Sequence, residues 1–380
     1  MLKKTVYFDY NATTPVNPEV LACMLPYFNQ QFGNASSIHS YGWQASEALD
    51  IAREQVAKLI AASPSEITFT SGATESLNMA IKGIAARFES KGKHIISFES
   101  EHNAVLESLK SLSSRGWEIE LLPLKTDGLP DLSLLQKAIR LDTVFIAAML
   151  ANNESGVVFP MSEITSIART NRVLTICDAT QACGKINVEV DELGVDVLAL
   201  SAHKFYGPKG CGALYLRRRN PRVTLEALIH GGGQEGSRRS GTLNIPAIVG
   251  MGKAAELATQ NLIMYKEKTM QLRDLLESEL RKNFDVQILA DEASRLSNTS
   301  FFRIKGIQSS LLISKLPHFA FSTGSACSSS DPRPSHVAIA MGLNEEQAFE
   351  AVRLSLGLDS EEVEIHAFVL ELKRNFSKLS

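Results

Sequence analysis

Two apolar runs of the sequence end in side chains that are capable of chemistry. Residues 195–200 are β-branched or aliphatic except for Asp196, and they lead into a polar turn that contains Lys204. Residues 172–177 form a second apolar run, which is followed at once by Asp178. Uniformly apolar strands are typical of parallel sheets, and ligands bind beyond the carboxyl ends of such strands. We therefore expect a lysine amine and a carboxylate at one edge of a sheet.

A lysine and a carboxylate at strand ends are the pair that a pyridoxal phosphate site requires. The lysine amine bonds covalently to the cofactor, and the carboxylate keeps the pyridine nitrogen protonated so that the ring accepts electrons. Each residue also has an ordinary interpretation. Lys204 would be a solvated lysine after a strand, and Asp178 would cap the helix that follows it.

A third segment is suited to binding a phosphate group. The strand-like residues 66–70 are followed by Ser71-Gly72-Ala73-Thr74 and then by the amphipathic run 76–83. Backbone N–H groups at a helix start, the helix dipole and the Thr74 hydroxyl all favour an anion. Taken alone, the segment is equally an ordinary helix cap. The sequence contains neither a Walker loop nor a Gly-x-Gly-x-x-Gly motif, which removes the usual support for nucleotide binding.

Taken together, these segments resemble the cysteine desulfurases, a branch of the class V aminotransferase-like, fold type I pyridoxal phosphate enzymes. The resemblance covers nearly the whole chain, and its motifs occur in the family order: Tyr7–Pro15, Thr70–Glu75, Glu101–Asn103, Asn152–Glu154, Asp178–Gln181, Ser201–Lys204, Arg239–Thr242, Gly324–Cys327 and Arg353–Gly357. The Gly-Ser-Ala-Cys form at residues 324–327 is similar to the group I (NifS/IscS-like) branch.

The resemblance implies roles for individual residues. Lys204 is expected to hold pyridoxal 5'-phosphate and to shuttle the Cα proton, and His102 to stack on the pyridine ring and exchange protons. Arg353 is expected to bind the substrate carboxylate, since its planar fork suits bidentate capture; a structural salt bridge is the competing interpretation. The expected cofactor-binding residues are Ala73, Thr74, His102, Asn153, Asp178, Gln181, Ser201, His203, Lys204 and Thr242, and Asn153 is also expected to contact the substrate. No metal ligands are expected.

Cys327 distinguishes a desulfurase from its relatives. It lies in the Gly-, Ser- and Pro-rich stretch 322–335, a composition typical of a loop and unsuited to burying a thiol. The resemblance implies that Cys327 takes sulfur from L-cysteine as a persulfide and that L-alanine is released. An aminotransferase or a selenocysteine lyase on the same scaffold is the alternative. A catalytically idle sulfur carrier or scaffold is a further alternative, which retained Lys204, His102, Asp178 and Cys327 disfavour.

Composition limits the classes of partner. The chain has 380 residues and a formal net charge of −3, which gives no general attraction to nucleic acid or to an anionic membrane. The longest uninterrupted apolar run, Val144–Ala151, is too short to span a bilayer. Five cysteines without a Cys-x-x-Cys pair argue against a disulfide framework. These features predict a cytoplasmic protein.

Strand-like and helix-like runs alternate from residue 15 to about 250, which predicts an α/β fold with a mostly parallel sheet. We expect a large cofactor-binding domain at 15–255, and a small α+β domain formed by 1–14 and 256–380 that carries the cysteine loop. The glycine-rich stretch 231–242 favours a homodimer, because in the family its threonine reaches the partner's cofactor phosphate. The expected sulfur acceptor is an iron–sulfur scaffold or a thiolation enzyme. The chain departs from the family pattern at Asn34-Ala35-Ser36, where Asn-Pro-Ser is usual.

Overall fold

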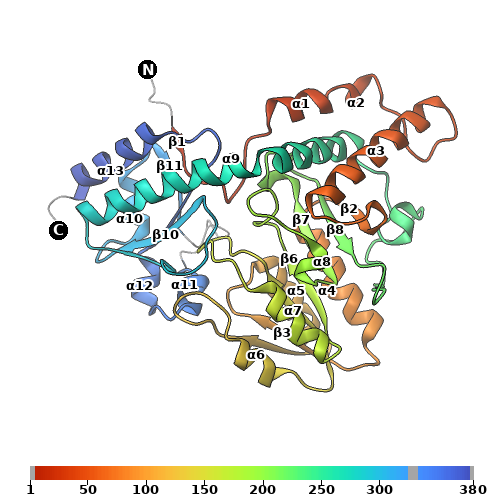
Figure 1. The fold of residues 1–380 in the computed structure, drawn as a ribbon, viewed down its shortest axis with the longest axis horizontal. Coiled ribbons are helices and arrows are strands. Elements are labelled where there is room, and N and C mark those ends of the chain that lie inside the picture. Colours follow the sequence, from red (N-terminus) through yellow and green to blue (C-terminus); the bar gives the residue numbers. More distant parts are fainter. Residues whose placement is uncertain (1–4, 324–332, 377–380) are drawn as a thin grey trace.

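The fold is built around a seven-stranded sheet in the larger of two lobes (Figure 1). The structure is a computed structural model, and it describes residues 5–323 and 333–376. The strand order is β2-β8-β7-β6-β5-β3-β4, and every pairing except those made by β8 is parallel. The strands are β2 (Ile67–Thr70), β3 (His94–Phe98), β4 (Glu118–Leu122), β5 (Thr143–Met149), β6 (Leu174–Asp178), β7 (Val197–Ser201) and β8 (Gly212–Leu216).

Both faces of this sheet are covered by helices, which explains why its central strands are apolar throughout. All residues of β5 are buried, and Phe145 and Ala147 face one hydrophobic cluster while Ile146 and Ala148 face another. This alternation follows from the period of two in a strand. The first cluster includes α4 (Ala73–Phe88) and α5 (Asn103–Ser113), and the second includes α1 (Pro18–Met24), α3 (Ser40–Leu59) and α7 (Met161–Thr170). The mostly parallel α/β fold is confirmed.

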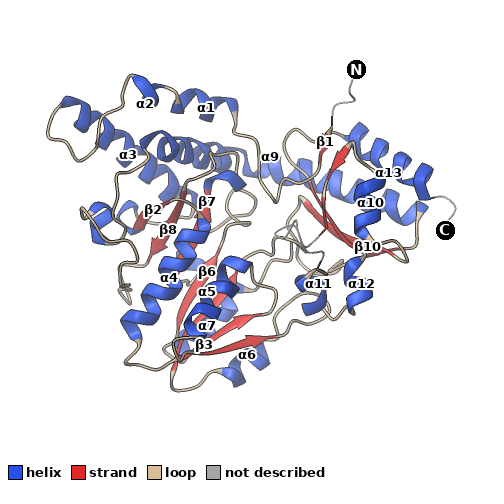
Figure 2. Cartoon of the chain, turned by 180° about the vertical axis from the view of Figure 1, so that it is seen from behind, coloured by secondary structure: helices blue, strands red, loops and turns tan. Residues whose placement is uncertain are grey.

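The smaller lobe contains a four-stranded antiparallel sheet in the order β12-β13-β10-β9, and Figure 2 shows it beside the larger sheet. Its strands are β9 (Val286–Ile288), β10 (Thr299–Ile304), β12 (Ser322–Thr323) and β13 (Ala351–Ser355). The remaining elements are β1 (Val6–Tyr7), β11 (Phe319–Ala320), α2 (Pro26–Asn29), α6 (Leu132–Ala138), α8 (Val190–Leu193), α10 (Ser309–Lys315), α11 (His336–Ala340), α12 (Glu345–Phe349), α13 (Glu362–Phe376) and the 3₁₀ turns Pro64–Glu66, Ala202–Lys204 and Gln234–Ser237.

The N-terminal segment packs with the smaller lobe. Val6 pairs with Phe319 in a parallel bridge between β1 and β11. Phe8 lies in a hydrophobic cluster with Leu272, Leu276 and residues of β10 and α13. Helix α9 (Ile245–Asn283) runs through both lobes, packing on α3 in one and on α13 in the other. We retain the division at residue 255 as a proposal, and it falls inside this continuous helix.

The edge strand β2 is covered by a loop and not by another strand. Glu235 accepts a hydrogen bond from Phe69 N at 2.8 Å, and it pairs with both Nη atoms of Arg53 at 2.7 and 2.9 Å. Arg53 also donates to Ile67 O at 2.9 Å. These side chains satisfy the backbone of the edge, which would otherwise be open to another strand. Within the described ranges, no helix is long and apolar enough to cross a membrane.

Candidate active site

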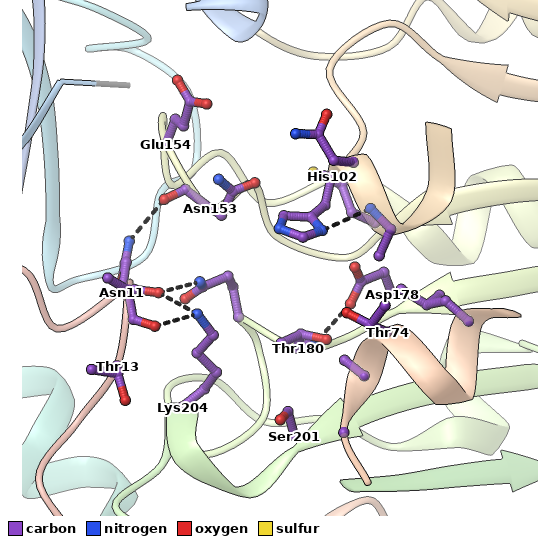
Figure 3. A pocket seen from close by; sticks show the side chains of 18 of the residues that line it. Asn11, Thr13, Thr74, His102, Asn153, Glu154, Asp178, Thr180, Ser201 and Lys204 are labelled. Atoms are coloured by element: carbon purple, nitrogen blue, oxygen red, sulfur yellow. Dashed lines mark hydrogen bonds between the residues drawn. The ribbon is translucent and has the colours of Figure 1, made fainter. Parts of the chain in front are cut away.

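A pocket of about 950 Å³ lies where the carboxyl ends of the large-sheet strands face the smaller lobe. Its lining comes from the ends of β6 and β7, the starts of α4 and α5, the N-terminal segment and β13. All but one of the predicted site residues that the structure describes line it. The lining members of that set are Ala73, Thr74, His102, Asn153, Asp178, Gln181, Ser201, His203, Lys204 and Arg353. Figure 3 labels six of them: Thr74, His102, Asn153, Asp178, Ser201 and Lys204.

Lys204 and Asp178 lie on neighbouring strands at the same edge. Lys204 is in the 3₁₀ turn that directly follows β7, while Asp178 is the last residue of β6 and pairs in register with Ala199. The Lys204 amine donates to the backbone carbonyls of Asn11 at 2.6 Å and Ala12 at 2.8 Å. Asp178 is 7% exposed, and its Oδ1 accepts from Thr180 N at 2.9 Å. Asp178 therefore makes a local turn contact and also lines the pocket.

His102 caps a helix and faces the pocket at the same time. It is the N-cap of α5, and its Nδ1 accepts a hydrogen bond from Ala104 N at 3.0 Å. Burial lowers the pKa of His102, the Lys204 and His336 charges lower it further, and the Asp178 carboxylate opposes them. The imidazole is therefore neutral near pH 7, with its proton on Nε2. The capping role and the pocket-facing role coexist in one side chain.

The predicted phosphate-binding segment begins α4. Gly72 is the N-cap with a φ of 153°, a conformation that favours glycine, and the helix starts at Ala73. The first N–H groups of a helix have no partner within it, and they point to where an anion would bind. Ser201 adjoins this turn, since a Cβ at Gly72 would lie 3.7 Å from its Oγ. We call residues 72–74 the anion seat.

Two residues predicted to bind the cofactor, His203 and Thr242, differ in whether they line the pocket. His203 Nδ1 lies 3.1 Å from Thr13 Oγ1, and burial together with the Lys204 charge lowers the pKa of His203 to about 4. Its ring is therefore neutral, and it offers a hydrogen bond without a charge. Thr242 is exposed and is not among the residues that line the pocket. A single chain therefore does not bring Thr242 to its own site.

Arg353 is held by protein groups while it faces the pocket. Its Nη2 donates to Asp9 Oδ1 at 2.6 Å and its Nη1 to Asn153 O at 2.9 Å. Its Nε is buried without a hydrogen-bond partner in the described part of the chain. A salt bridge thus fixes a guanidinium that lines the pocket, and capture of the substrate carboxylate by Arg353 stays a prediction.

Asn11 connects the two lobes beneath Lys204. It is 1% exposed and makes seven hydrogen bonds within the described residues, with Asn153, Gln181, Lys185, Lys204, Asn298, Thr299 and Ser355. We call Asn11, Gln181, Lys185 and Lys204 the pocket floor. Sequence analysis assigned no role to Asn11 or Lys185. Asn11 lay inside a quoted motif, whereas nothing in the sequence marked Lys185.

The donor set of the pocket fits pyridoxal phosphate. The anion seat suits the phosphate, Asp178 suits the protonated pyridine nitrogen and Lys204 supplies the amine. Asn153 Oδ1 and Thr180 Oγ1 line the pocket, yet neither has a hydrogen-bond partner within residues 5–323 and 333–376. Buried polar atoms are rarely left in this state, which indicates that they serve a bound molecule.

Acidic residues and a second histidine occupy the rim toward the smaller lobe. Glu101 is fully buried, its Oε1 accepts from Met149 N at 2.7 Å, and burial raises its pKa well above 4.5. His336 Nε2 donates to Glu101 O at 3.0 Å, and Ser335 Oγ donates to Glu154 Oε2 at 2.5 Å. Sequence analysis gave none of the four a role, because their contacts depend on how α11 packs against the larger lobe. Glu101 and Glu154 lay inside quoted motifs, whereas nothing in the sequence marked Ser335 or His336.

The predicted catalytic cysteine, Cys327, lies outside the residues that the structure describes. The four described cysteines do not line the pocket. Burial is the main cause that raises the pKa of all four thiols, Cys23, Cys177, Cys183 and Cys211. None of these four is suited to act as a nucleophile in the pocket, because the thiolate is the reactive form.

Comparison with known proteins agrees with this geometry. The family model for class-V aminotransferases matches residues 6–368. A cysteine desulfurase IscS of Anaeromyxobacter sp. (strain Fw109-5) is 45% identical over 383 residues, which span 100% of this chain and 94% of that protein.

Solved structures with the same fold extend over nearly the whole chain. A NifS-like protein has a TM-score of 0.92 and 38% identity, covering 98% of this chain and 99% of its own. SspA, solved in complex with cysteine, has a TM-score of 0.82 and 35% identity, covering 93% of this chain and 99% of its own.

Proposed function

Because this chain belongs to the class-V aminotransferase family, and within it to the cysteine desulfurases, we propose a residue-by-residue assignment for its reaction. The protein is a pyridoxal phosphate-dependent cysteine desulfurase. The observation that supports the site assignment is the convergence of the Lys204 amine, the Asp178 carboxylate and the anion seat on one pocket. This combination also favours desulfurase chemistry over an idle carrier, which needs no such convergence.

The cofactor is held by three parts of the pocket. Ala73, Thr74, Ser201 and His203 hold the phosphate, Asp178 holds the pyridine nitrogen, and Gln181 and Asn153 hydrogen-bond to the ring substituents. When bound, pyridoxal phosphate draws electrons from the amino acid and so weakens the bonds at its Cα and Cβ atoms. His102 lies against the ring, since its capped imidazole faces the cavity in Figure 3.

Lys204 and His102 move protons on the substrate. The Lys204 amine takes the proton from Cα and returns to its two carbonyl partners, which stabilise the ammonium form. The neutral His102 ring exchanges its Nε2 proton with the substrate. Arg353 and Asn153 orient the substrate carboxylate, and the Asp9 contact keeps the Arg353 fork in place before L-cysteine enters.

Cys327 receives the sulfur. Its thiolate attacks the sulfur of the bound substrate, a sulfur–sulfur bond forms, and the substrate carbon–sulfur bond breaks as its electron pair goes to carbon. That carbon takes up a proton and L-alanine leaves, so the sum is L-cysteine plus a thiol giving L-alanine plus a persulfide. No outside oxidant is needed. The poor reactivity expected of the four described thiols supports this assignment.

Substitution of Cys327 by alanine tests the sulfur step. The Cys327→Ala variant should bind the cofactor normally, as its visible absorption would show, and should lose alanine release from L-cysteine by on the order of 10³-fold or more. Mass spectrometry should find a persulfide on the wild-type peptide that contains residue 327 and none on the variant. Undiminished alanine release by the variant would contradict the assignment and point to a lyase that releases free sulfide.

We also propose a homodimer, a protein acceptor for the sulfur, and a cytoplasmic location. The dimer is supported by Thr242, which does not line its own pocket, and by a row of exposed apolar side chains on α1, α2, α3 and their connections. We call this row the outer face; its members are Leu21, Leu25, Phe28, Phe32, Ile38, Tyr41, Trp43 and Ile51. The acceptor class, an iron–sulfur scaffold or a thiolation enzyme, is proposed from the family resemblance.

A further inference from the structure

Lys185 is a buried lysine to which the reaction described above gives no role. It lies in the turn after β6, four residues beyond Gln181, and only 2% of it is exposed. Its amine donates to Gln181 Oε1 at 2.6 Å and to Asn11 Oδ1 at 2.7 Å. A lysine is rarely buried to this degree unless its amine has specific partners.

The charge state of Lys185 agrees with these two contacts. Burial lowers its pKa well below 10.5, and the positive charges of Lys204 and Arg353 lower it further. A neutral amine carries two N–H donors, and the two amide oxygens accept both. The site is therefore satisfied without an ion pair, and no counter-charge is needed beside the reactive Lys204.

The two contacts fix how the neighbouring amides are turned. Because Gln181 Oε1 accepts from Lys185, its Nε2 must lie on the other side, where it donates to Asn11 O at 2.9 Å. Lys204 donates to the same carbonyl at 2.6 Å. Gln181 therefore presents N–H donors on the side that Lys204 and the pocket occupy. Without Lys185, only the contact between Gln181 Nε2 and Asn11 O would remain among the described hydrogen bonds to hold the Gln181 oxygen away from the pocket.

We propose that Lys185 is a positioning residue, which turns the Gln181 amide so that its N–H groups, and not its oxygen, face the phenolic oxygen of the cofactor. The inference rests on the proposed function, because it requires Gln181 to contact that oxygen. A donor at this place stabilises the ionised oxygen. Lys185 thus acts through Gln181 on the protonation of the bound cofactor and touches neither cofactor nor substrate.

The pH titration of the visible absorption of the holoenzyme, without substrate, tests this. In Lys185→Met the Gln181 amide is free to turn, so the midpoint pH should rise by about one unit and cofactor should bind about tenfold more weakly, the loss of one hydrogen bond to a charged group. Gln181→Leu should show the same rise, because it removes the donor itself. Lys58→Met, at an exposed lysine of α3, is the matched control and should leave the midpoint unchanged.

The double variant decides whether Lys185 acts through Gln181. If it does, Lys185→Met combined with Gln181→Leu should shift the midpoint no further than either change alone. Additive shifts, or a lower melting temperature of Lys185→Met with an unchanged midpoint, would overturn the inference. An unshifted Gln181→Leu would do so even if Lys185→Met failed to fold. Wild-type protein that bound no cofactor would instead contradict the proposed function.

Discussion

The pocket floor and the outer face differ in how their side chains are used: those of the floor are buried or half-buried and hydrogen-bonded within one chain, and those of the outer face remain exposed. On the floor, Asn11 uses every backbone and side-chain polar atom in contacts within one chain. On the outer face, Phe32 and Trp43 remain 65% and 63% exposed, and Ile38 is 92% exposed. Exposed large apolar side chains that gather on neighbouring elements favour an interaction site. One chain thus completes the amine side of the pocket, and under the proposed homodimer a second copy completes the phosphate side.

This difference separates two kinds of failure. Damage to the floor should affect chemistry within each chain and should not depend on protein concentration. Damage to the outer face should act through assembly, so its effect should grow on dilution.

The largest effect is expected from Lys204→Ala. The variant loses the amine that we propose takes the Cα proton, so alanine release should fall by on the order of 10⁴-fold or more. Circular dichroism should show a folded chain, since the hydrogen bonds from the Lys204 amine to Asn11 O and Ala12 O end on the N-terminal segment and not on the large sheet. Borohydride reduction followed by peptide mapping should place the pyridoxyl group on Lys204 of the wild type, and its recovery on another lysine would refute the assignment.

A smaller, concentration-dependent loss is expected when the outer face is charged. Phe32→Glu combined with Trp43→Glu should give monomers in light scattering and reduce alanine release at least about tenfold at low protein concentration, because burying two unpaired charges at an interface costs several kcal/mol. Leu141→Glu is the control, since Leu141 is fully exposed and lies away from this face. A wild-type monomer with full activity would remove the dimer from the proposal.

The smallest effect is expected at Glu101, and like damage to the floor it should act within each chain and not through assembly. Because burial raises the folded-state pKa of Glu101, the folded chain keeps this carboxyl protonated at pH values where the unfolded chain ionises it. The contribution of Glu101 to the free energy of unfolding is therefore fully present below its ordinary pKa of 4.5, and it falls as the pH rises toward the folded-state pKa.

Glu101→Gln mimics the protonated acid and keeps the oxygen that accepts from Met149 N. The variant should match the wild type near pH 4 and become more stable by roughly 1–3 kcal/mol at neutral pH, the cost of an unpaired buried polar group. Denaturant unfolding at several pH values measures the difference. A difference that stayed constant from pH 4 to 8 would contradict the raised pKa.

The strands and the residues at their ends were predictable from the sequence. Lys204, Asp178 and Thr74 each follow a short apolar run, and parallel strands bring their carboxyl ends to one edge. Alternating strand-like and helix-like runs were expected from residue 15 to about 250, and the strands of the large sheet lie between Ile67 and Leu216. Local pattern was sufficient in these cases because each side chain is placed by its own strand.

The floor and rim were not predictable in the same way. In the sequence, Lys185 is one more lysine in a polar turn. Only the approach of Asn11, 174 residues away, makes it a buried donor. Glu101 and His336 are brought together across 235 residues by the packing of α11. The role of each depends on a partner distant in the chain, and a single sequence carries no signal of such a pairing.

The Asn11 contacts also set an order of events during synthesis. Asn11 N donates to Ser355 Oγ across 344 residues, and Asn11 Nδ2 donates to Thr299 Oγ1. A growing polypeptide can complete the large sheet long before residue 355 leaves the ribosome. It cannot yet complete the hydrogen bonds that fix Asn11, whose carbonyl accepts from Lys204. Stable capture of the cofactor is therefore an event that follows translation of nearly the entire chain.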